Sequence, residues 1–197
     1  MESKQRCDWV NEKNHLYVHY HDTEWGIELK DDRKLFELLC LEGAQAGLTW
    51  EMILNKREDY RKAFWNFDPK VLSNKTYKEL LEAMANSNVV KNKLKTEGLK
   101  KNAIAYLAII EEHGSFSKYI WSFVNDTQIV NSWASYYMAP TQTEESQAMS
   151  KGLKKYGFTF TGPVICYAFM QAAGLVSDHE IDCFKCPVDH PNKVDKK

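Results

Sequence analysis

Two cysteine–histidine pairs near the ends of the chain carry the side chains that zinc prefers. Cys7 and His21 are separated by 13 residues, and His179 and Cys183 by three. The second spacing, i and i+4, places both side chains on one face of a helix or helical turn. Two thiolates and two imidazoles suit tetrahedral zinc, and because four protein ligands leave no open position, such a zinc would be structural. The spacing also fits ordinary histidines without a metal. Two competing ligands lie close in the sequence, Cys186 and His19.

A carboxylate falls on the apolar side of a predicted helix. Leu35, Leu38 and Leu39 mark the inward face of the segment 31–46, and Glu42 is the next position on that face, at i+7. A carboxylate there costs several kcal/mol to desolvate unless it is paired. Three interpretations are open: the helix drifts so that Glu42 leaves the apolar face, a lysine or arginine pairs with Glu42, or the acid faces a ligand at the floor of a pocket.

Aromatic residues crowd the same quarter of the chain. They are Trp9, Tyr17, Tyr20, Trp25 and Trp50. Each one alone would be typical of a core. Together with one buried acid, they predict a box that stacks a flat ring and favours a positively charged one.

A glycine-bounded segment, GFTFTGP at 157–163, lies between two predicted helices. It leaves backbone N–H groups free at the start of the second helix, where they attract anions. Lysines add positive charge nearby and on a long helix: Lys151, Lys154 and Lys155, then Lys91, Lys93, Lys95, Lys100 and Lys101. Such lysine runs are also typical of a solvated face. Combined with the hairpin, they indicate contact with a DNA backbone, without sequence information and with strong salt dependence.

The composition is that of a folded domain. The chain has 197 residues and a mass of 22.9 kDa, 44% of its residues are hydrophobic, and its net charge is −1 with a pI near 6.6. These values exclude a disordered chain, a disulfide-stapled miniprotein and a polycation that coats nucleic acid. The sequence has no signal-peptide core and no apolar run long enough for a membrane span, so we expect a cytoplasmic protein without membrane contact. In that reducing compartment Cys40 and Cys166 are interpreted as small core residues.

Capping residues, glycines and prolines divide the sequence into a series of predicted helices, and this series predicts an all-α fold. Helices are expected over 31–46, 49–64, from Pro69, from Thr76 with its capping box, from about 89 to 113, around 116–123, over 144–155 and from Pro163 to near Gly174. The segment 131–143 is interpreted as an irregular surface connection. We expect one domain over 1–187 and a frayed tail over 188–197.

Several motifs together resemble type I bacterial 3-methyladenine DNA glycosylases. The stretches are RCDWV, YHDTEWG, LFELLCLEGAQAGLTW and KKYGFTFTGPVICYAFMQAAGLVSDH, followed by Cys183. The resemblance implies a helix-hairpin-helix DNA-repair fold whose structural zinc joins the N- and C-terminal segments. It implies hydrolysis of the N-glycosidic bond of 3-methyladenine in double-stranded alkylated DNA, which leaves an abasic site and free 3-methyladenine.

The same resemblance assigns roles to single residues. The zinc ligands would be Cys7, His21, His179 and Cys183, with Cys186 a bystander. Glu42 would be the catalytic acid that reads the methylated base. Tyr20 and Trp50 would sandwich that base, while Trp9 and Tyr17 would line the pocket. The family lacks the catalytic aspartate of other helix-hairpin-helix glycosylases, and none is assigned here.

The DNA-facing residues depart in part from the family's pattern. The hairpin reads FTFTGPV where relatives often have FKFVGPT, and the long helix lacks an arginine-rich run. We expect Gly162, Lys154 and Lys155 to meet phosphates, the two lysines replacing the missing hairpin charge. Leu48, after Gly47 in a tight turn, is either a wedge that fills the vacated base stack or a core residue.

Two other functions remain open at this stage. The chain could be a monomeric, non-enzymatic DNA-binding module that uses zinc for stability. It could also be a broader alkylpurine glycosylase that removes 7-methylguanine as well, although an acid matched to an adenine edge argues against that. We expect a monomer in either case.

Overall fold

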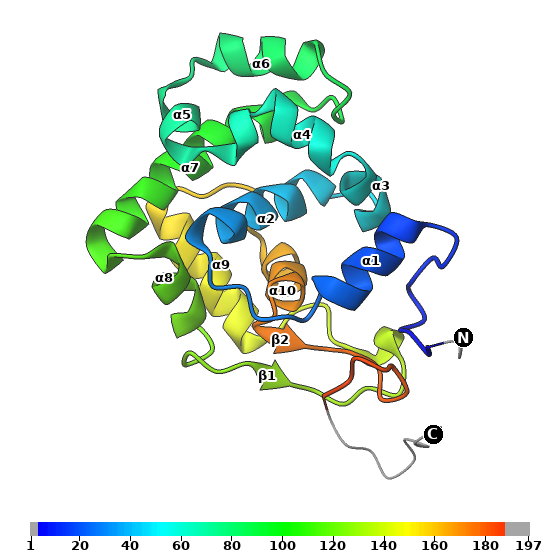
Figure 1. Ribbon diagram of the computed structural model, residues 1–197. Coiled ribbons are helices and arrows are strands. Elements are labelled where there is room, and N and C mark those ends of the chain that lie inside the picture. The colour runs from blue at the N-terminus through cyan, green and yellow to red at the C-terminus, as the bar shows by residue number, and fades with distance from the viewer. Residues whose placement is uncertain (1–3, 188–197) are drawn as a thin grey trace.

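Helices make up nearly all the regular structure of the computed structural model, which describes residues 4–187 (Figure 1). The α-helices are α1 (His15–Thr23), α2 (Asp32–Gln45), α3 (Trp50–Asn55), α4 (Arg57–Ala63), α5 (Pro69–Asn74), α6 (Tyr77–Ala85), α7 (Lys93–His113), α8 (Phe116–Ser122), α9 (Glu144–Tyr156) and α10 (Pro163–Ala172). Two 3₁₀ turns, η1 (Trp65–Phe67) and η2 (Tyr136–Met138), and two short strands complete the described chain, β1 (Ile129–Val130) and β2 (Val176–Ser177). The predicted all-α class is confirmed.

Capping residues begin and end the helices where the sequence predicted. The Asp31 side chain accepts a hydrogen bond from the backbone N–H of Lys34 at the start of α2, and Thr76 forms a reciprocal capping box with Glu79 at the start of α6. Gly114 ends α7 in the left-handed conformation that glycine adopts without strain. The local signals therefore agree with the tertiary structure.

Three details of the predicted secondary structure are wrong. The expected helix over 49–64 is two helices, because the chain breaks at Lys56 between α3 and α4. The helix α1 was not predicted. The segment 131–143 is less irregular than expected: β1 leads into it and pairs in parallel with β2, and η2 lies inside it. The predicted frayed tail over 188–197 lies outside the described residues.

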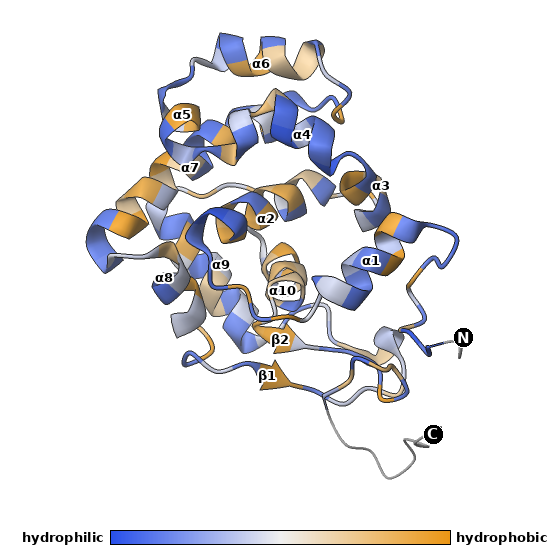
Figure 2. Cartoon of the chain, in the orientation of Figure 1, coloured by the Kyte–Doolittle hydropathy of each residue, from blue (hydrophilic) through white to orange (hydrophobic). Residues whose placement is uncertain are grey.

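The core forms where the long helices meet in the middle of the molecule. Helix α2 packs against α10, α7 and α8, while α9 packs against α10 and α7. Figure 2 shows α10 coloured hydrophobic along most of its length, with hydrophilic turns on outer helices such as α4. Fully buried aromatic side chains fill the space between these helices, including Phe36, Phe116 and Phe169. No helix in the described part of the chain has both the length and the hydrophobicity to cross a membrane.

Candidate active site and metal centre

A cavity of about 190 Å³ opens beside the C-terminal half of α2. It is larger than the roughly 150 Å³ cavity that admits one benzene molecule, so it has room for one planar base. Its lining comes from five separate parts of the chain: Trp9, Tyr17, Tyr20, Trp25, Glu42, Gln45, Trp50, Tyr136, Ala168 and Gln171. All five predicted aromatic residues therefore meet at one place together with the predicted acid.

Glu42 is the only carboxylate in this lining, and it has no partner among residues 4–187. Its side chain is buried at 4% exposure, and no described residue lies within hydrogen-bond or ion-pair distance of it. Burial raises the pKa of Glu42 to about 8. The pairing with lysine or arginine that the sequence left open is therefore absent from the described chain, and the acid faces the cavity instead.

The rings around Glu42 touch one another. The Tyr20 and Trp50 ring centroids are 5.4 Å apart with planes at 47°, and those of Trp9 and Tyr17 are 5.1 Å apart at 57°. A base stacked between two rings needs about 3.5 Å on each face. The predicted sandwich between Tyr20 and Trp50 is therefore wrong for the rings as they stand. Both residues still line the cavity.

Two donors of the cavity wall are unpaired as well. The indole N–H groups of Trp9 and Trp50 are buried and have no hydrogen-bond partner among the described residues. An unpaired buried donor costs about 1–3 kcal/mol, so a polar ligand that meets it recovers that free energy. The residues of the cavity wall therefore carry one buried acid and two buried donors that have no partner among the described residues.

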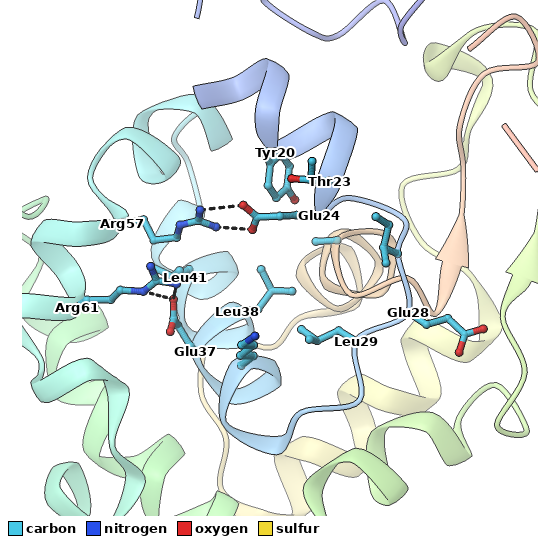
Figure 3. Close-up of a pocket in the computed structure, with 13 residues that line it drawn as sticks. Tyr20, Thr23, Glu24, Glu28, Leu29, Glu37, Leu38, Leu41, Arg57 and Arg61 are labelled. Atoms are coloured by element: carbon cyan, nitrogen blue, oxygen red, sulfur yellow. Dashed lines mark hydrogen bonds and ion pairs between the residues drawn. The ribbon is translucent and has the colours of Figure 1, made fainter. Parts of the chain in front are cut away.

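A second cavity is larger, about 350 Å³, but its carboxylates are all paired with basic side chains. Figure 3 shows Arg57 paired with Glu24 and Arg61 paired with Glu37 along its wall. Tyr20 borders both cavities. By volume this second cavity would be the better candidate active site. The smaller cavity is the better candidate by its chemistry, because only the smaller one holds a buried acid that is unpaired among the described residues. We assign the candidate active site to the cavity at Glu42.

The four predicted metal ligands converge in a buried cluster. Their ligand atoms all lie within 4.8 Å of one another. Nδ1 of His179 lies 3.5 Å from Sγ of Cys7 and 3.6 Å from Sγ of Cys183, and Nε2 of His21 lies 3.4 Å from Sγ of Cys183. A turn rather than a helix brings His179 and Cys183 together. The cluster joins the N- and C-terminal segments and is consistent with a metal site.

Neighbouring hydrogen-bond acceptors hold both histidines in the tautomer that a metal ligand needs. Nδ1 of His21 lies 2.8 Å from a carboxylate oxygen of Asp22, and Nε2 of His179 lies 3.3 Å from the carbonyl oxygen of Trp25. Because these oxygens only accept, each of those ring nitrogens carries the proton, and the other nitrogen presents a lone pair to the cluster. Burial opposes ionisation of Asp22, but hydrogen bonds from Arg6 and His21 lower its pKa to about 2.

The competing ligands lie outside the cluster. His19 is exposed on α1, and Cys186 is buried but absent from the group of converging atoms. The sequence alone could not decide among these side chains, since the choice depends on how the two ends of the chain meet.

The hairpin between α9 and α10 is held against α7. The backbone N–H of Thr159 donates to Oδ1 of the buried Asn102 at 2.8 Å, and the Ser150 hydroxyl donates to the Thr161 carbonyl at 2.6 Å. Gly98 permits the close approach, because a Cβ there would lie 2.8 Å from Oγ1 of Thr159. Gly162 caps α10 with open space around its Cα, and Lys154 and Lys155 are exposed at the end of α9. The phosphate contact expected of Gly162, Lys154 and Lys155 stays a prediction.

Three of the lysines near or on α7 have a different task. Their ammonium groups donate to carbonyl groups at the C-terminal ends of other helices. Lys91 bonds Met84, Ala85 and Ser87 at the end of α6, Lys95 bonds Ala44 and Ala46 at the end of α2, and Lys100 bonds Lys75 directly after α5. Cations there are favourable because a helix C-terminus carries partial negative charge. The predicted DNA footprint along this helix is therefore reduced to Lys93 and Lys101, which are exposed.

Leu48 lies in the turn between α2 and α3. Gly47 has φ of +79°, and the backbone N–H of Leu48 donates to the Gln45 carbonyl at 2.6 Å. The side chain is half-buried and packs against the edge of the core. Leu48 follows a cavity residue by three positions, which keeps the wedge hypothesis open.

Sequence reasoning missed four residues of the cavity wall, Gln45, Tyr136, Ala168 and Gln171. Gln45 is one turn beyond Glu42 on α2, so helical spacing could have found it. Tyr136 lies in the segment that was interpreted as a surface connection. The one available signal was a pair of adjacent tyrosines in a segment without charges.

Comparison with known proteins gives one consistent family. The methyladenine glycosylase family model matches residues 9–186. The chain is 51% identical over 178 residues to a DNA-3-methyladenine glycosylase of Haemophilus influenzae, which covers 90% of this chain and 96% of that protein. A crystal structure of 3-methyladenine DNA glycosylase I superposes with a TM-score of 0.90 at 45% identity, covering 93% of this chain and 100% of that one. A variant of such an enzyme in complex with 3-methyladenine superposes with a TM-score of 0.86 at 38% identity, covering 90% and 96%.

Proposed function

The chain belongs to the methyladenine glycosylase family, and we propose that it is a base-excision repair glycosylase that hydrolyses the N-glycosidic bond of 3-methyladenine in double-stranded alkylated DNA. The products are an abasic site and free 3-methyladenine. One observation carries the proposal for this chain's own residues: Glu42 is buried, without a partner in the described part of the chain, in an aromatic cavity large enough for one base.

The mechanism begins with extrusion of the damaged nucleotide from the duplex. Unstacking costs a few kcal/mol, least for a lesion that pairs poorly. Leu48 fills the vacated stack, while Gly162, Lys154 and Lys155 hold the backbone through amides and positive charge. These contacts carry no base information, so recognition of the lesion occurs in the cavity.

Glu42 selects the base by charge and by hydrogen bonding. Methylation at N3 makes the adenine of DNA cationic, and a carboxylate at the cavity wall complements that charge while it accepts hydrogen bonds from the adenine edge. The base stacks on free aromatic faces, including those of Tyr20 and Trp50, and Trp9 and Tyr17 line its surroundings. Stacking from both sides would require the Tyr20 and Trp50 rings to part.

The chemistry needs little help with the leaving group. The bond between the sugar and the base breaks with its electron pair moving to the base, which neutralises the positive charge. The sugar gains oxocarbenium character, and water adds to its anomeric carbon and loses a proton. Glu42 acts by holding the cationic base in the orientation from which this bond breaks, in a cavity that shields the interaction from bulk water.

We assign zinc to the buried cluster of Cys7, His21, His179 and Cys183. Zinc bonded to sulfur at about 2.3 Å and to nitrogen at about 2.0–2.1 Å places neighbouring tetrahedral ligands roughly 3.5 Å apart. The sulfur–nitrogen distances of 3.4–3.6 Å support this assignment. With four protein ligands, zinc supplies cross-linking of the two terminal segments and no chemistry on the base.

The test is release of methylated bases from duplex DNA treated with a methylating agent, with the products separated by chromatography. We expect 3-methyladenine in the soluble fraction, and at least tenfold slower release by Glu42→Gln, which keeps the shape but removes the charge. Glu111→Gln, at an exposed position of α7, is the matched control and should release the base at the wild-type rate.

The alternative function is a DNA-binding module that uses zinc only for stability. Such a module would release no base, and free 3-methyladenine would leave its tryptophan fluorescence unchanged. For the glycosylase we expect quenching, because Trp9 and Trp50 line the cavity. Equal release of 7-methylguanine would instead identify a broader alkylpurine glycosylase.

A further inference from the structure

The 3₁₀ turn η2 presents two large apolar side chains to solvent directly beside the candidate active site. Tyr136 lines the cavity, and its ring centroid lies 6.3 Å from that of Trp9. The next two residues point outward: Tyr137 is 82% exposed and Met138 is 62% exposed. An adjacent tyrosine and methionine with this exposure lose favourable burial unless something covers them.

The backbone that carries these side chains is anchored by two buried acids. Glu180 accepts the N–H of Tyr136 at 2.5 Å and the N–H of Asp8 at 2.8 Å, so one carboxylate holds η2 and the segment before Trp9. Upstream, Asp178 accepts the side-chain amide of Asn131 at 2.7 Å. It also accepts the indole N–H of Trp133 at 2.9 Å. The exposed pair is therefore held in a defined position relative to the cavity.

The segment around η2 carries no charge. Every residue from Thr127 to Thr143 is uncharged, although 27% of the whole chain is charged. The bounding carboxylates are Asp126 before it and Glu144 in the first turn of α9. This segment adds no carboxylate of its own that would repel a polyanion, and without lysines or arginines it does not bind phosphates by charge. Such a surface suits contact with bases and sugars.

We propose that Tyr137 and Met138 form a second apolar contact with the duplex beside the extruded nucleotide. Tyr137 stacks on a base that loses its neighbour when the damaged base leaves, and Met138 packs against the adjoining sugar or base. Leu48 and Tyr137 follow the wall residues Gln45 and Tyr136 by three positions and one position, so the proposal adds one apolar contact next to each of these two parts of the wall. The proposal rests on the proposed glycosylase function, because it takes extruded duplex DNA as the occupant.

The experiment compares Tyr137→Ala, Tyr137→Phe and Met138→Ala with the wild type in two binding measurements. The first is fluorescence anisotropy of a labelled duplex with one stable abasic-site analogue, at several KCl concentrations. The second is quenching of tryptophan fluorescence by free 3-methyladenine. Tyr77→Ala, on α6 and away from the cavity, is the matched control for removal of a partly exposed tyrosine.

We expect Tyr137→Ala to weaken duplex binding about 5- to 100-fold, the range for loss of one base–aromatic stack. Met138→Ala should weaken it several-fold, while Tyr137→Phe, which keeps the aromatic face, and Tyr77→Ala should stay within about twofold of the wild type. Affinity for free 3-methyladenine should be unchanged in all variants. The slope of log Kd against log [KCl] should also be unchanged, since no phosphate contact is lost.

Three results would overturn the proposal. Duplex binding by Tyr137→Ala at the wild-type level would leave η2 without a DNA contact. Equal loss of affinity for the free base would make the turn a support of the cavity, and a salt slope smaller by about one would make it a phosphate contact. Because these measurements need no bond cleavage, a wild-type protein that releases no 3-methyladenine would contradict the proposed function without deciding this surface.

Discussion

An unpaired acid at the wall of an apolar cavity is costly for the folded protein. The cost appears at Glu42 as a pKa near 8, so that in the empty cavity the side chain is largely protonated at neutral pH. A cationic base beside it favours the carboxylate and lowers that pKa. The residue is therefore neutral while the site is empty and charged when the cationic base arrives, and this selects a positively charged ligand over a neutral one.

This coupling predicts the pH dependence of excision. Below about pH 8, binding of the cationic base releases a proton from Glu42, so kcat/KM should rise with pH by up to about tenfold per unit and level off above pH 8. The neighbouring phenols do not interfere, because burial raises the pKa of Tyr17, Tyr20 and Tyr136. Steady-state excision from methylated duplex DNA between pH 6 and 9 measures the profile, and Glu42→Gln should remove the rise.

Protein stability provides the control for that interpretation. Since the folded pKa of Glu42 lies above its unfolded value of 4.5, its contribution to stability is complete below pH 4.5 and is lost as the pH rises through 8. Glu42→Gln should therefore unfold at higher urea concentration than the wild type at pH 9, while it excises more slowly. A variant that is both slower and less stable at pH 9 would contradict this account of the buried acid.

Glu42 could be predicted from the sequence because the pattern of a single helix is sufficient evidence for it. The residue stands at i+7 on an apolar stripe, and any acid there must be paired or functional. Tyr136 could not be found in this way. It reaches the cavity through hydrogen bonds to Glu180 and through the pairing of β1 with β2, and these depend on tertiary contacts that local patterns do not encode.

At the scale of elements, the turn after α2 is held by a lysine from another helix. The ammonium group of Lys95 on α7 lies 2.8 Å from the Ala44 carbonyl and 2.6 Å from the Ala46 carbonyl. These two bonds satisfy carbonyl groups that the end of a helix leaves free. They also fix the start of the Gly47–Leu48 turn, which carries the proposed wedge.

Replacement of Lys95 should therefore affect both stability and excision. We expect Lys95→Met, which keeps the length of the side chain but removes the donor, to lower the free energy of unfolding by about 1–3 kcal/mol. It should also slow excision from duplex DNA, since the turn that carries Leu48 is loosened, and weaken affinity for free 3-methyladenine to a smaller extent, since Gln45 of the cavity wall lies between the two bonded carbonyl groups. Urea denaturation and the two assays described above measure these effects.

Lys93→Met is the matched control on the same helix. The Lys93 ammonium lies 3.8 Å from a Glu97 carboxylate oxygen in an exposed pair, which is worth less than about 0.5 kcal/mol. Equal destabilisation by both variants would show that the loss reflects charge on α7 in general and not the two hydrogen bonds.

Helix ends with local caps were predictable from sequence, and caps from distant residues were not. Asp31, Thr76 and Gly114 mark their helix ends through neighbours in sequence, so the predicted limits of α2, α6 and α7 were close or correct at those ends. The lysines that cap α2, α5 and α6 come from segments that follow later in the chain, and by composition they were indistinguishable from a DNA-binding face. The break at Lys56 likewise has no local glycine or proline to reveal it.

At the scale of the whole molecule, the cluster of cysteines and histidines joins the two terminal segments next to the active-site cavity. Cys7 precedes Trp9, a cavity residue, by two positions, and the cluster residue His21 directly follows Tyr20, another. The rings of Trp9 and His21 are 5.3 Å apart. Loss of the metal should therefore release part of the cavity wall as well as the ends of the chain.

We expect protein purified without chelator to contain one zinc per chain and to lose it with Cys183→Ala. Removal of the zinc should lower Tm by on the order of 10 °C, because several kcal/mol of metal binding stabilise only the folded state. It should also weaken quenching by free 3-methyladenine, through Trp9. Metal analysis, thermal unfolding and the fluorescence assay measure these three effects on the same preparations.

Cys186→Ala removes a buried thiol outside the ligand set, and it should keep both the zinc and the affinity for the base. Purified wild-type protein without zinc, or loss of zinc from Cys186→Ala but not from Cys183→Ala, would rule out the proposed ligand set.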